Sequence, residues 1–179
     1  DPECVFGVSP FGIWQNDDGK NGGSDTDGTS AYDELYCDAA AWINGGYIDY
    51  IAPQLYWRFN NKSARFDTLV RWWNTLCDST GVDLYISHGV YRYDEGWEEP
   101  EGEILNQIEF ARSELSYRGS LLYGYDVIRR NSKGIENELA VAFDREIIYT
   151  DTVSTGVGVS VTSPEEGITL SSLPTTYLL

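Results

Sequence analysis

The sequence predicts an α/β fold with a parallel sheet, in about four βα units over 179 residues, a number that would make half of a (β/α)8 TIM-type barrel, a half-barrel. Short apolar segments alternate with longer ones in which apolar residues recur at helical spacing. Predicted strands begin near residues 4, 48, 82 and 119, a repeat of roughly one βα unit. They are nearly continuous apolar runs, as in a parallel sheet covered on both faces. A small doubly wound domain would show the same repeat.

The first predicted strand, residues 4–10, leads into a polar loop of Gly, Asp and Asn over residues 15–30. Ser30 is placed to cap the next helix, with Asp33 three residues later in the manner of a capping box. We expect one helix from there to the Gly45–Gly46 pair, which would end it. Its apolar positions are Tyr32, Leu35, Tyr36, Ala39, Trp42 and Ile43.

The second unit consists of a strand over residues 48–56 and a helix over about 63–79. Pro53 stands inside the strand and cannot donate a ladder hydrogen bond. The helix carries an apolar stripe with the spacing of one buried face. The stripe consists of Phe66, Leu69, Val70, Trp73, Leu76 and Cys77.

The third and fourth strands are expected at residues 82–91 and 120–125, and a last helix from Asp126 onward. Between these strands, a helix carries Ile104, Ile108, Ala111 and Leu115. We assign residues 1–150 to the α/β domain. From residue 151 the chain becomes rich in Thr, Ser and Val. We expect residues 151–179 to form a linker and the start of a truncated β-rich module, or a tail with no fold of its own.

Composition excludes several classes of protein. Twelve basic and 29 acidic residues give a formal charge of −17, which disfavours nucleic acid and acidic lipid surfaces as partners. No apolar run is long enough to span a membrane, and no signal peptide is visible. Because the chain begins Asp1-Pro2 and contains no Met, we expect it to be an internal piece of a longer protein.

The cysteines do not indicate a metal site. Cys4, Cys37 and Cys77 lack C-x-x-C spacing. We expect buried free thiols, with Cys37 in a helix; one disulfide is the alternative if the protein is exported. The Asp-rich loop does not match the EF-hand spacing. The sequence predicts no metal and no cofactor.

Each predicted strand ends in aromatic and amide side chains, and in α/β folds ligands bind beyond the carboxyl ends of the strands. Aromatic rings can stack on the C–H face of a sugar while amides hydrogen-bond its hydroxyls. The alternative for any one residue is that it caps the core, and His88 in particular is the kind of residue that packs in a hydrogen-bonded core. The candidate substrate-binding residues are Trp14, Asn16, Gln54, Tyr56, Trp57, His88, Tyr91, Trp97 and Tyr125.

Other chemistries fit less well. The single histidine limits Ser-His-Asp or Cys-His sites to His88. No Gly-rich phosphate motif follows a strand. A flavodoxin-like domain would need its first βα loop to bind phosphate, and a long Asp-rich loop is unsuited to that.

Motifs along residues 5–135 resemble the glycosyl-hydrolase-like family 10 catalytic domain. In chain order they are FGVSPFGIWQN, GSDTDG, YDELYCDAAAWI, IDYIAPQLYW, RFDTLVRWW, DLYISHGVYR, NQIEFAR and KGI. The family pattern WRN occurs here as Trp14-Gln15-Asn16, without the Arg. The resemblance implies a (β/α)8 barrel of an exported or lipid-anchored bacterial envelope protein that hydrolyses glycosidic bonds, with cell-wall glycan strands as substrate. It also implies that this chain is the second half of the barrel.

Glycoside hydrolysis usually needs two carboxyl groups. The candidate in this chain is Asp25, in the loop after the first strand; a helix-entry or turn role is the alternative. Asp27 stands at a position that the family varies. Glu98, Glu101 and Glu103 are weaker candidates. Further catalytic carboxylates are expected upstream.

Two functions from different classes remain open. One is a glycosidase, and the other is a non-catalytic carbohydrate-binding or scaffolding barrel, since fold does not fix function. Both have an oligosaccharide or polysaccharide as partner. A half-barrel leaves two open sheet edges. We therefore expect the isolated chain to need its other half, or to associate through those edges.

Overall fold

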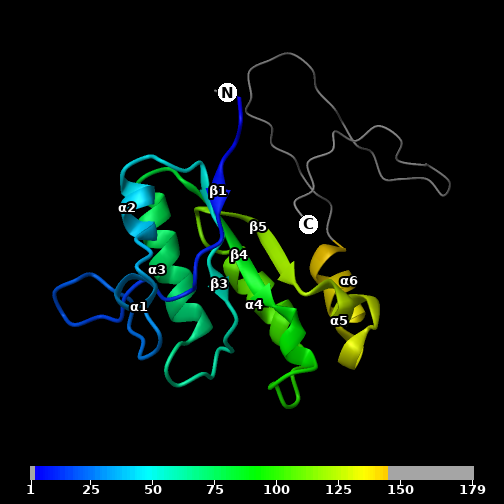
Figure 1. Cartoon of the computed structure of the whole chain (residues 1–179). Coiled ribbons are helices and arrows are strands. Elements are labelled where there is room, and N and C mark those ends of the chain that lie inside the picture. Colours follow the sequence, from blue (N-terminus) through cyan, green and yellow to red (C-terminus); the bar gives the residue numbers. More distant parts are fainter. Residues whose placement is uncertain (1–2, 145–179) are drawn as a thin grey trace. The chain divides into compact units, whose positions relative to one another are not determined.

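A computed structural model describes residues 3–144 (Figure 1). The predicted β-rich tail, and the boundary near residue 150, lie outside the described residues. In chain order the elements are β1 (Gly7–Val8), α1 (Ala31–Leu35), α2 (Ala39–Asn44), β2 (Tyr50–Ile51), β3 (Gln54–Leu55), α3 (Phe66–Asp78), β4 (Asp83–Gly89), η1 (Val90–Tyr93), α4 (Glu103–Ala111), β5 (Tyr117–Tyr123), α5 (Tyr125–Arg129), η2 (Ser132–Gly134) and α6 (Ile135–Phe143).

The strands form one parallel sheet in the order in which they occur along the chain. β1 pairs with β2, β2 and β3 both pair with β4, and β4 pairs with β5. The predicted strand 48–56 is thus two short strands, because Pro53 interrupts the ladder. In a (β/α)8 barrel, strands that follow one another in the chain are neighbours in the sheet, as they are here. A doubly wound sheet instead reverses its strand order at one point, and the described sheet has no such reversal.

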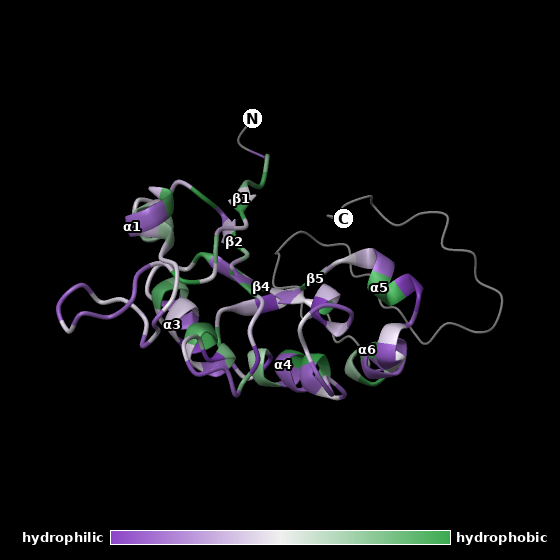
Figure 2. Ribbon diagram, turned by 60° about the horizontal axis from the view of Figure 1, so that its bottom comes forward, coloured by the Kyte–Doolittle hydropathy of each residue, from purple (hydrophilic) through white to green (hydrophobic). Residues whose placement is uncertain are grey.

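Helices α3, α4 and α6 lie along one side of the sheet (Figure 2). Tyrosines and small residues line the other face of the described sheet. A Cβ on Gly7 or Gly119 would meet the ring of Tyr50 or Tyr85, respectively, so each ring lies over a glycine of the neighbouring strand. Aromatic side chains had made these strands appear uniformly apolar.

The core forms between α3 and the sheet. Five members of the predicted α3 stripe are fully buried, and Leu76 packs against them. Burying each large side chain contributes about 1.5–3 kcal/mol relative to exposure. Trp73 also donates its indole N–H to the carbonyl oxygen of Gly12 at 2.8 Å. This helix therefore fixes the position of the segment that follows β1.

The single helix expected over residues 30–45 is two helices. Ser30 does cap α1, accepting from the amide of Asp33 at 3.1 Å. Tyr36 then adopts a left-handed conformation with φ 53°, and Asp38 caps α2 through the amide of Ala41. Leu35 and Tyr36 are consequently exposed, although helical spacing predicted them buried.

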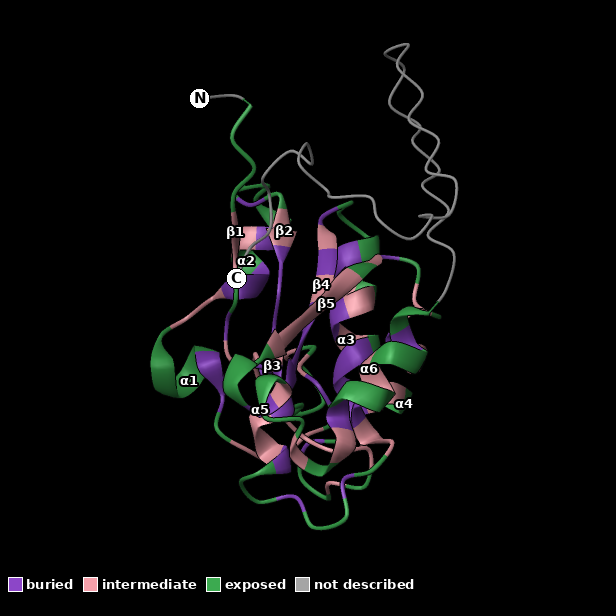
Figure 3. Cartoon of the chain, turned by 90° about the vertical axis from the view of Figure 1, so that its right-hand side faces the viewer, coloured by how far each residue is buried: buried purple, intermediate pink, exposed green. Residues whose placement is uncertain are grey.

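Other boundaries also differ from the prediction. β4 gives way to η1 at Val90, and α4 ends at Ala111, so that Leu115 is exposed. β5 runs from Tyr117 to Tyr123 and is partly exposed along its length, as expected for a strand with one partner in the described sheet (Figure 3).

The three cysteines are free, as expected, but only Cys77 is buried, whereas Cys4 is exposed and Cys37 partly exposed. Cys37 lies between α1 and α2 rather than in a helix. Burial in α3 raises the pKa of Cys77 to about 12, which keeps its thiol protonated. Within residues 3–144, no helix is both long and apolar enough to cross a membrane.

Candidate functional site

Three tyrosines meet at the carboxyl end of the sheet. Tyr56 follows β3, Tyr91 lies in η1 directly after β4, and Tyr123 ends β5. The rings of Tyr56 and Tyr123 stack with 5.8 Å between centroids and 7° between planes. Tyr91 presents a near-perpendicular ring to both, at 5.6 Å. These three residues, the tyrosine cluster, form a continuous aromatic surface contributed by three strand ends.

Gly89, at the end of β4, makes room for the tyrosine cluster. It is the register partner of Tyr123, and a Cβ on it would stand 2.9 Å from the Cβ of Tyr56. The hydroxyl of Tyr56 lies 3.2 Å from the Oγ of Ser87 on the same strand as Gly89. Burial raises the pKa of Tyr56, so its hydroxyl is a neutral donor and acceptor. The cluster therefore offers ring faces and a hydroxyl, the groups that suit a sugar.

Gln54 begins β3, and Trp57 follows Tyr56 just beyond the end of that strand. Phe11 bridges to Gln54, and its ring meets Trp57 edge-on at 5.6 Å. Gln54 donates its amide to the carbonyl oxygen of Ser9 at 3.0 Å. Both candidates are partly exposed. The structure therefore brings Gln54, Tyr56, Trp57 and Tyr91 to one end of the sheet, as predicted.

Asp25 is exposed on a loop whose neighbours are firmly held. Thr26 donates its hydroxyl to the side-chain oxygen of Asn16 at 2.8 Å, and Asn16 donates its amide to the carbonyl oxygen of Gly28 at 2.7 Å. Asp27 is tied through its backbone amide to Ser63. Asn16 thus organises the loop, which presents the Asp25 carboxylate to solvent.

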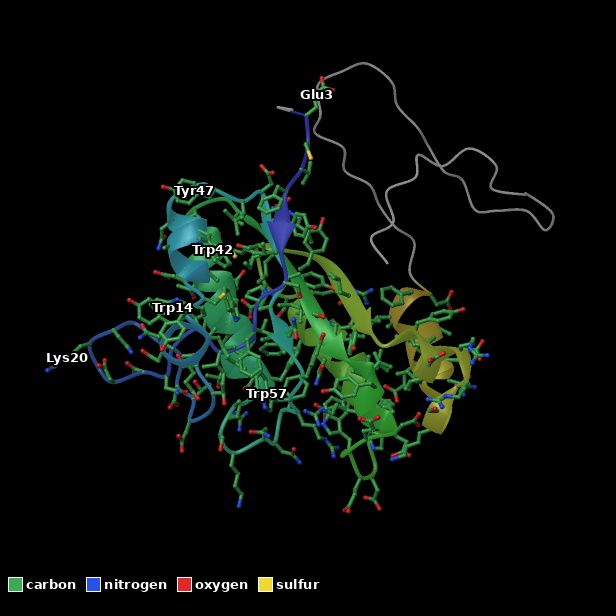
Figure 4. All side chains as sticks on the ribbon, viewed as in Figure 1. Glu3, Trp14, Lys20, Trp42, Tyr47 and Trp57 are labelled. Carbon is green, nitrogen blue, oxygen red and sulfur yellow. The ribbon has the colours of Figure 1, made fainter. Side chains whose placement is uncertain are left out.

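Trp14 lies beside this loop, apart from Trp57 (Figure 4). Its ring stacks on Trp72 at 5.6 Å, and its indole N–H donates to Asp38 at 3.1 Å. Trp72 in turn donates to the carbonyl oxygen of Gly22. Trp14 therefore connects the loop to α2 and α3. A pocket that includes Gly22, Arg71 and Trp72 lies on the outer side of α3, away from the strand ends.

His88 is fully buried on the helix side of β4, where it stacks on Phe66. Its Nδ1 lies 3.0 Å from the Oε1 of Gln107 and its Nε2 2.8 Å from the Oγ of Ser120. Gln107 uses its own amide N–H groups on Trp57 and Glu103, so the amide oxygen faces His88. Nδ1 must therefore donate and Nε2 accept. This is a neutral imidazole inside the core.

Trp97 and Tyr125 lie outside the cluster. Trp97 is buried, packs against Tyr93 and lies 5.8 Å below the guanidinium of Arg58. Tyr125 begins α5 and is 70% exposed. Among the weaker acidic candidates, Glu103 accepts from Arg58 and from the amide of Phe59, whereas Glu98 and Glu101 are exposed.

Tyr123 and Arg92 also lie at this site; both stand among the strand-end residues of the sequence, although neither is among the candidate substrate-binding residues. Tyr123 is in the cluster because β5 ends two residues earlier than predicted. Arg92 lies over the ring of Tyr91, with 4.9 Å from its guanidinium carbon to the ring centroid. Both follow the strand-end pattern.

Comparison with known proteins is consistent with this architecture. The model of the family described as glycosyl hydrolase-like 10 matches residues 1–99. The chain belongs to this family. It is 38% identical over 144 residues to the glycosyl hydrolase YngK of Bacillus subtilis (strain 168), covering 78% of this chain and 28% of that protein. It is 36% identical over 137 residues to the glycosyl hydrolase DigH of Escherichia coli (strain K12), covering 72% and 31%.

A third similar protein is the glycosyl hydrolase DigH of Escherichia coli O6:H1 (strain CFT073). It is 40% identical over 121 residues, covering 67% of this chain and 28% of that protein. The chain therefore spans just under a third of the length of the relatives that it matches.

Within residues 3–144, no group of three or more His, Cys, Asp or Glu side chains could hold a metal ion.

Proposed function

We propose that this glycosyl hydrolase-like 10 chain forms part of a glycoside hydrolase that acts on bacterial cell-wall glycan strands. The tyrosine cluster at the carboxyl end of the parallel sheet carries this proposal, because stacked phenol rings flanked by a hydroxyl suit a pyranose. We place the parent protein outside the cell or in its envelope, secreted or lipid-anchored.

The proposed fold context is a closed (β/α)8 barrel to which this chain contributes half. The sequential parallel order and the one-sided helices support it, as does the limited share of each relative that the chain spans. Other strands would then pair with the free sides of β1 and β5. They would also bring the carboxyl groups that this half does not supply.

Asp25 is the proposed catalytic carboxyl of this half, because the hydrogen-bonded loop that follows β1 holds it exposed. The test is to incubate the complete protein with peptide-free cell-wall glycan strands and to identify products by mass spectrometry. Asp25→Asn should abolish release of oligosaccharides. Asp27→Asn, an exposed change two residues away, is the matched control and should retain it. Equal release by both variants would remove Asp25 from catalysis.

The tyrosine cluster is tested separately by binding. Tyr123→Ala should weaken glycan binding about three- to tenfold, the effect of losing one aromatic contact. Tyr47→Ala is a suitable control, because Tyr47 is also exposed and lies beside α2, away from Trp57 (Figure 4). Unchanged binding in Tyr123→Ala would contradict the proposed surface.

A non-catalytic carbohydrate-binding barrel is the second candidate. The observation that favours it is the make-up of the cluster, whose ring and hydrogen-bond contacts in the described residues include no carboxyl group. The same incubation separates the two functions. Retained glycan binding with no product from the wild-type protein would favour the binding barrel.

A further inference from the structure

Arg92 places a permanent positive charge against the tyrosine cluster. It lies in η1, next to Tyr91, and its guanidinium carbon is 4.9 Å from the centroid of that ring. Tyr91 in turn contacts the rings of Tyr56 and Tyr123. Guanidinium groups stack favourably on aromatic faces, which limits their orientation. A ligand resting on the cluster would therefore lie beside a partly fixed cation.

The side chain of Arg92 has no anionic partner in the described residues. Of the eight arginines within residues 3–144, the other seven each lie within 4.0 Å of a carboxylate. The nearby acid Asp94 pairs with Arg130 at 2.7 Å. The buried Nε of Arg92 lacks a hydrogen-bond partner. A buried donor left unpaired costs free energy, so this position is set for an acceptor that the described chain does not supply.

We propose that Arg92 binds a carboxylate carried by the saccharide that stacks on the tyrosine cluster. The inference rests on the proposed saccharide function and specifies the charge of one sugar unit. A carboxylate accepts two hydrogen bonds from a guanidinium group in a planar fork, which a neutral sugar cannot do. In a chain with a formal charge of −17, a free cation at the strand ends also offsets the repulsion that an acidic ligand meets elsewhere.

The test compares two forms of one ligand. Peptide-free cell-wall glycan strands carry free carboxylates, and coupling to ammonia converts these to neutral amides of nearly the same shape. Affinity for both forms is measured with the complete protein and with Arg92→Gln. The matched control is Arg118→Gln, which also removes one charge but lies on β5 in an exposed pair with Asp83. Circular dichroism of each variant checks that it is folded.

The wild-type protein should bind the carboxylate form about tenfold or more tightly than the amide form, as for a charge-assisted hydrogen bond. Arg92→Gln should bring the ratio close to one, and Arg118→Gln should leave it unchanged. A wild-type ratio of one, or a preference that survives Arg92→Gln, overturns the inference while leaving the saccharide function intact. Failure to bind either form, or to act on it, would instead contradict the proposed function itself.

Discussion

Acidification from neutral pH should destabilise the fold through His88. Burial lowers the pKa of His88 from its ordinary value of 6.5 to about 4. A folded-state pKa below the unfolded one means that the unfolded chain binds the proton more tightly between these values. The stability contributed by neutral His88 is therefore complete above the unfolded pKa. It is lost progressively as the pH falls toward the folded pKa.

The magnitude follows from the two pKa values. Each unit of difference corresponds to about 1.4 kcal/mol, so the full effect is about 3 kcal/mol. By about pH 5 the loss should reach about 2 kcal/mol, while carboxyl groups with pKa values near 4 remain largely ionised. The hydrogen bonds explain the direction, because the imidazole Nε2 accepts from Ser120 and a proton there would have no carboxylate to face.

Two measurements test this argument on the 179-residue chain, under conditions in which it is folded. Urea unfolding, followed by tryptophan fluorescence between about pH 8 and pH 5, should show the loss of free energy, and His88→Gln should flatten the profile. Because His88 is the only histidine, its imidazole proton resonances can be followed directly by NMR, and they should not titrate in this range. A midpoint close to the ordinary value of 6.5 would refute the assignment of a buried neutral imidazole.

Two further predictions concern backbone positions. In Gly89→Ala, the added Cβ would press against the Cβ of Tyr56. The substitution should lower the free energy of unfolding, measured by urea titration, by about 1–3 kcal/mol and should weaken glycan binding. Unchanged values for both would contradict the packing described. Tyr36 has a left-handed backbone conformation and is 92% exposed, so Tyr36→Gly removes backbone strain and few side-chain contacts. The substitution should raise the urea midpoint by an amount that corresponds to about 1 kcal/mol of unfolding free energy. A lower midpoint would show that the contacts of the tyrosine ring stabilise the fold by more than the strain destabilises it.

The sequence was most informative for features that depend on local sequence alone. The apolar stripe of α3 and the Ser30 cap were predicted, because helical spacing and a side-chain cap depend on local sequence. The break at Tyr36 was not predicted, because the apolar spacing continues through it and only the Asp38 cap reveals a second helix start. Strand ends depend on pairing with distant segments, which the sequence of one strand does not contain.

The same limit applied to the candidate site. Aromatic and amide residues at strand ends were predictable as a class, and the structure brings Tyr56, Tyr91 and Trp57 to one edge. Which face a side chain takes was not predictable, because a shift of one residue reverses every side chain. His88 accordingly points into the helix layer, and Tyr123 takes the place at the strand end that had been expected for Tyr125.

The open face of the sheet connects the fold to the proposed barrel. Tyr50 and Tyr85 meet at 5.4 Å and lie over glycines of adjacent strands, so this face is filled near the sheet by flat rings instead of branched side chains. In a closed barrel it would be the interior, where inward residues from neighbouring strands stack in layers. The tyrosine cluster would then form the uppermost of these layers at the mouth. In this arrangement the aromatic surface proposed to bind the saccharide continues the packing of the barrel interior. This explains why the cluster combines a residue in a strand, Tyr123, with residues just beyond strand ends, Tyr56 and Tyr91.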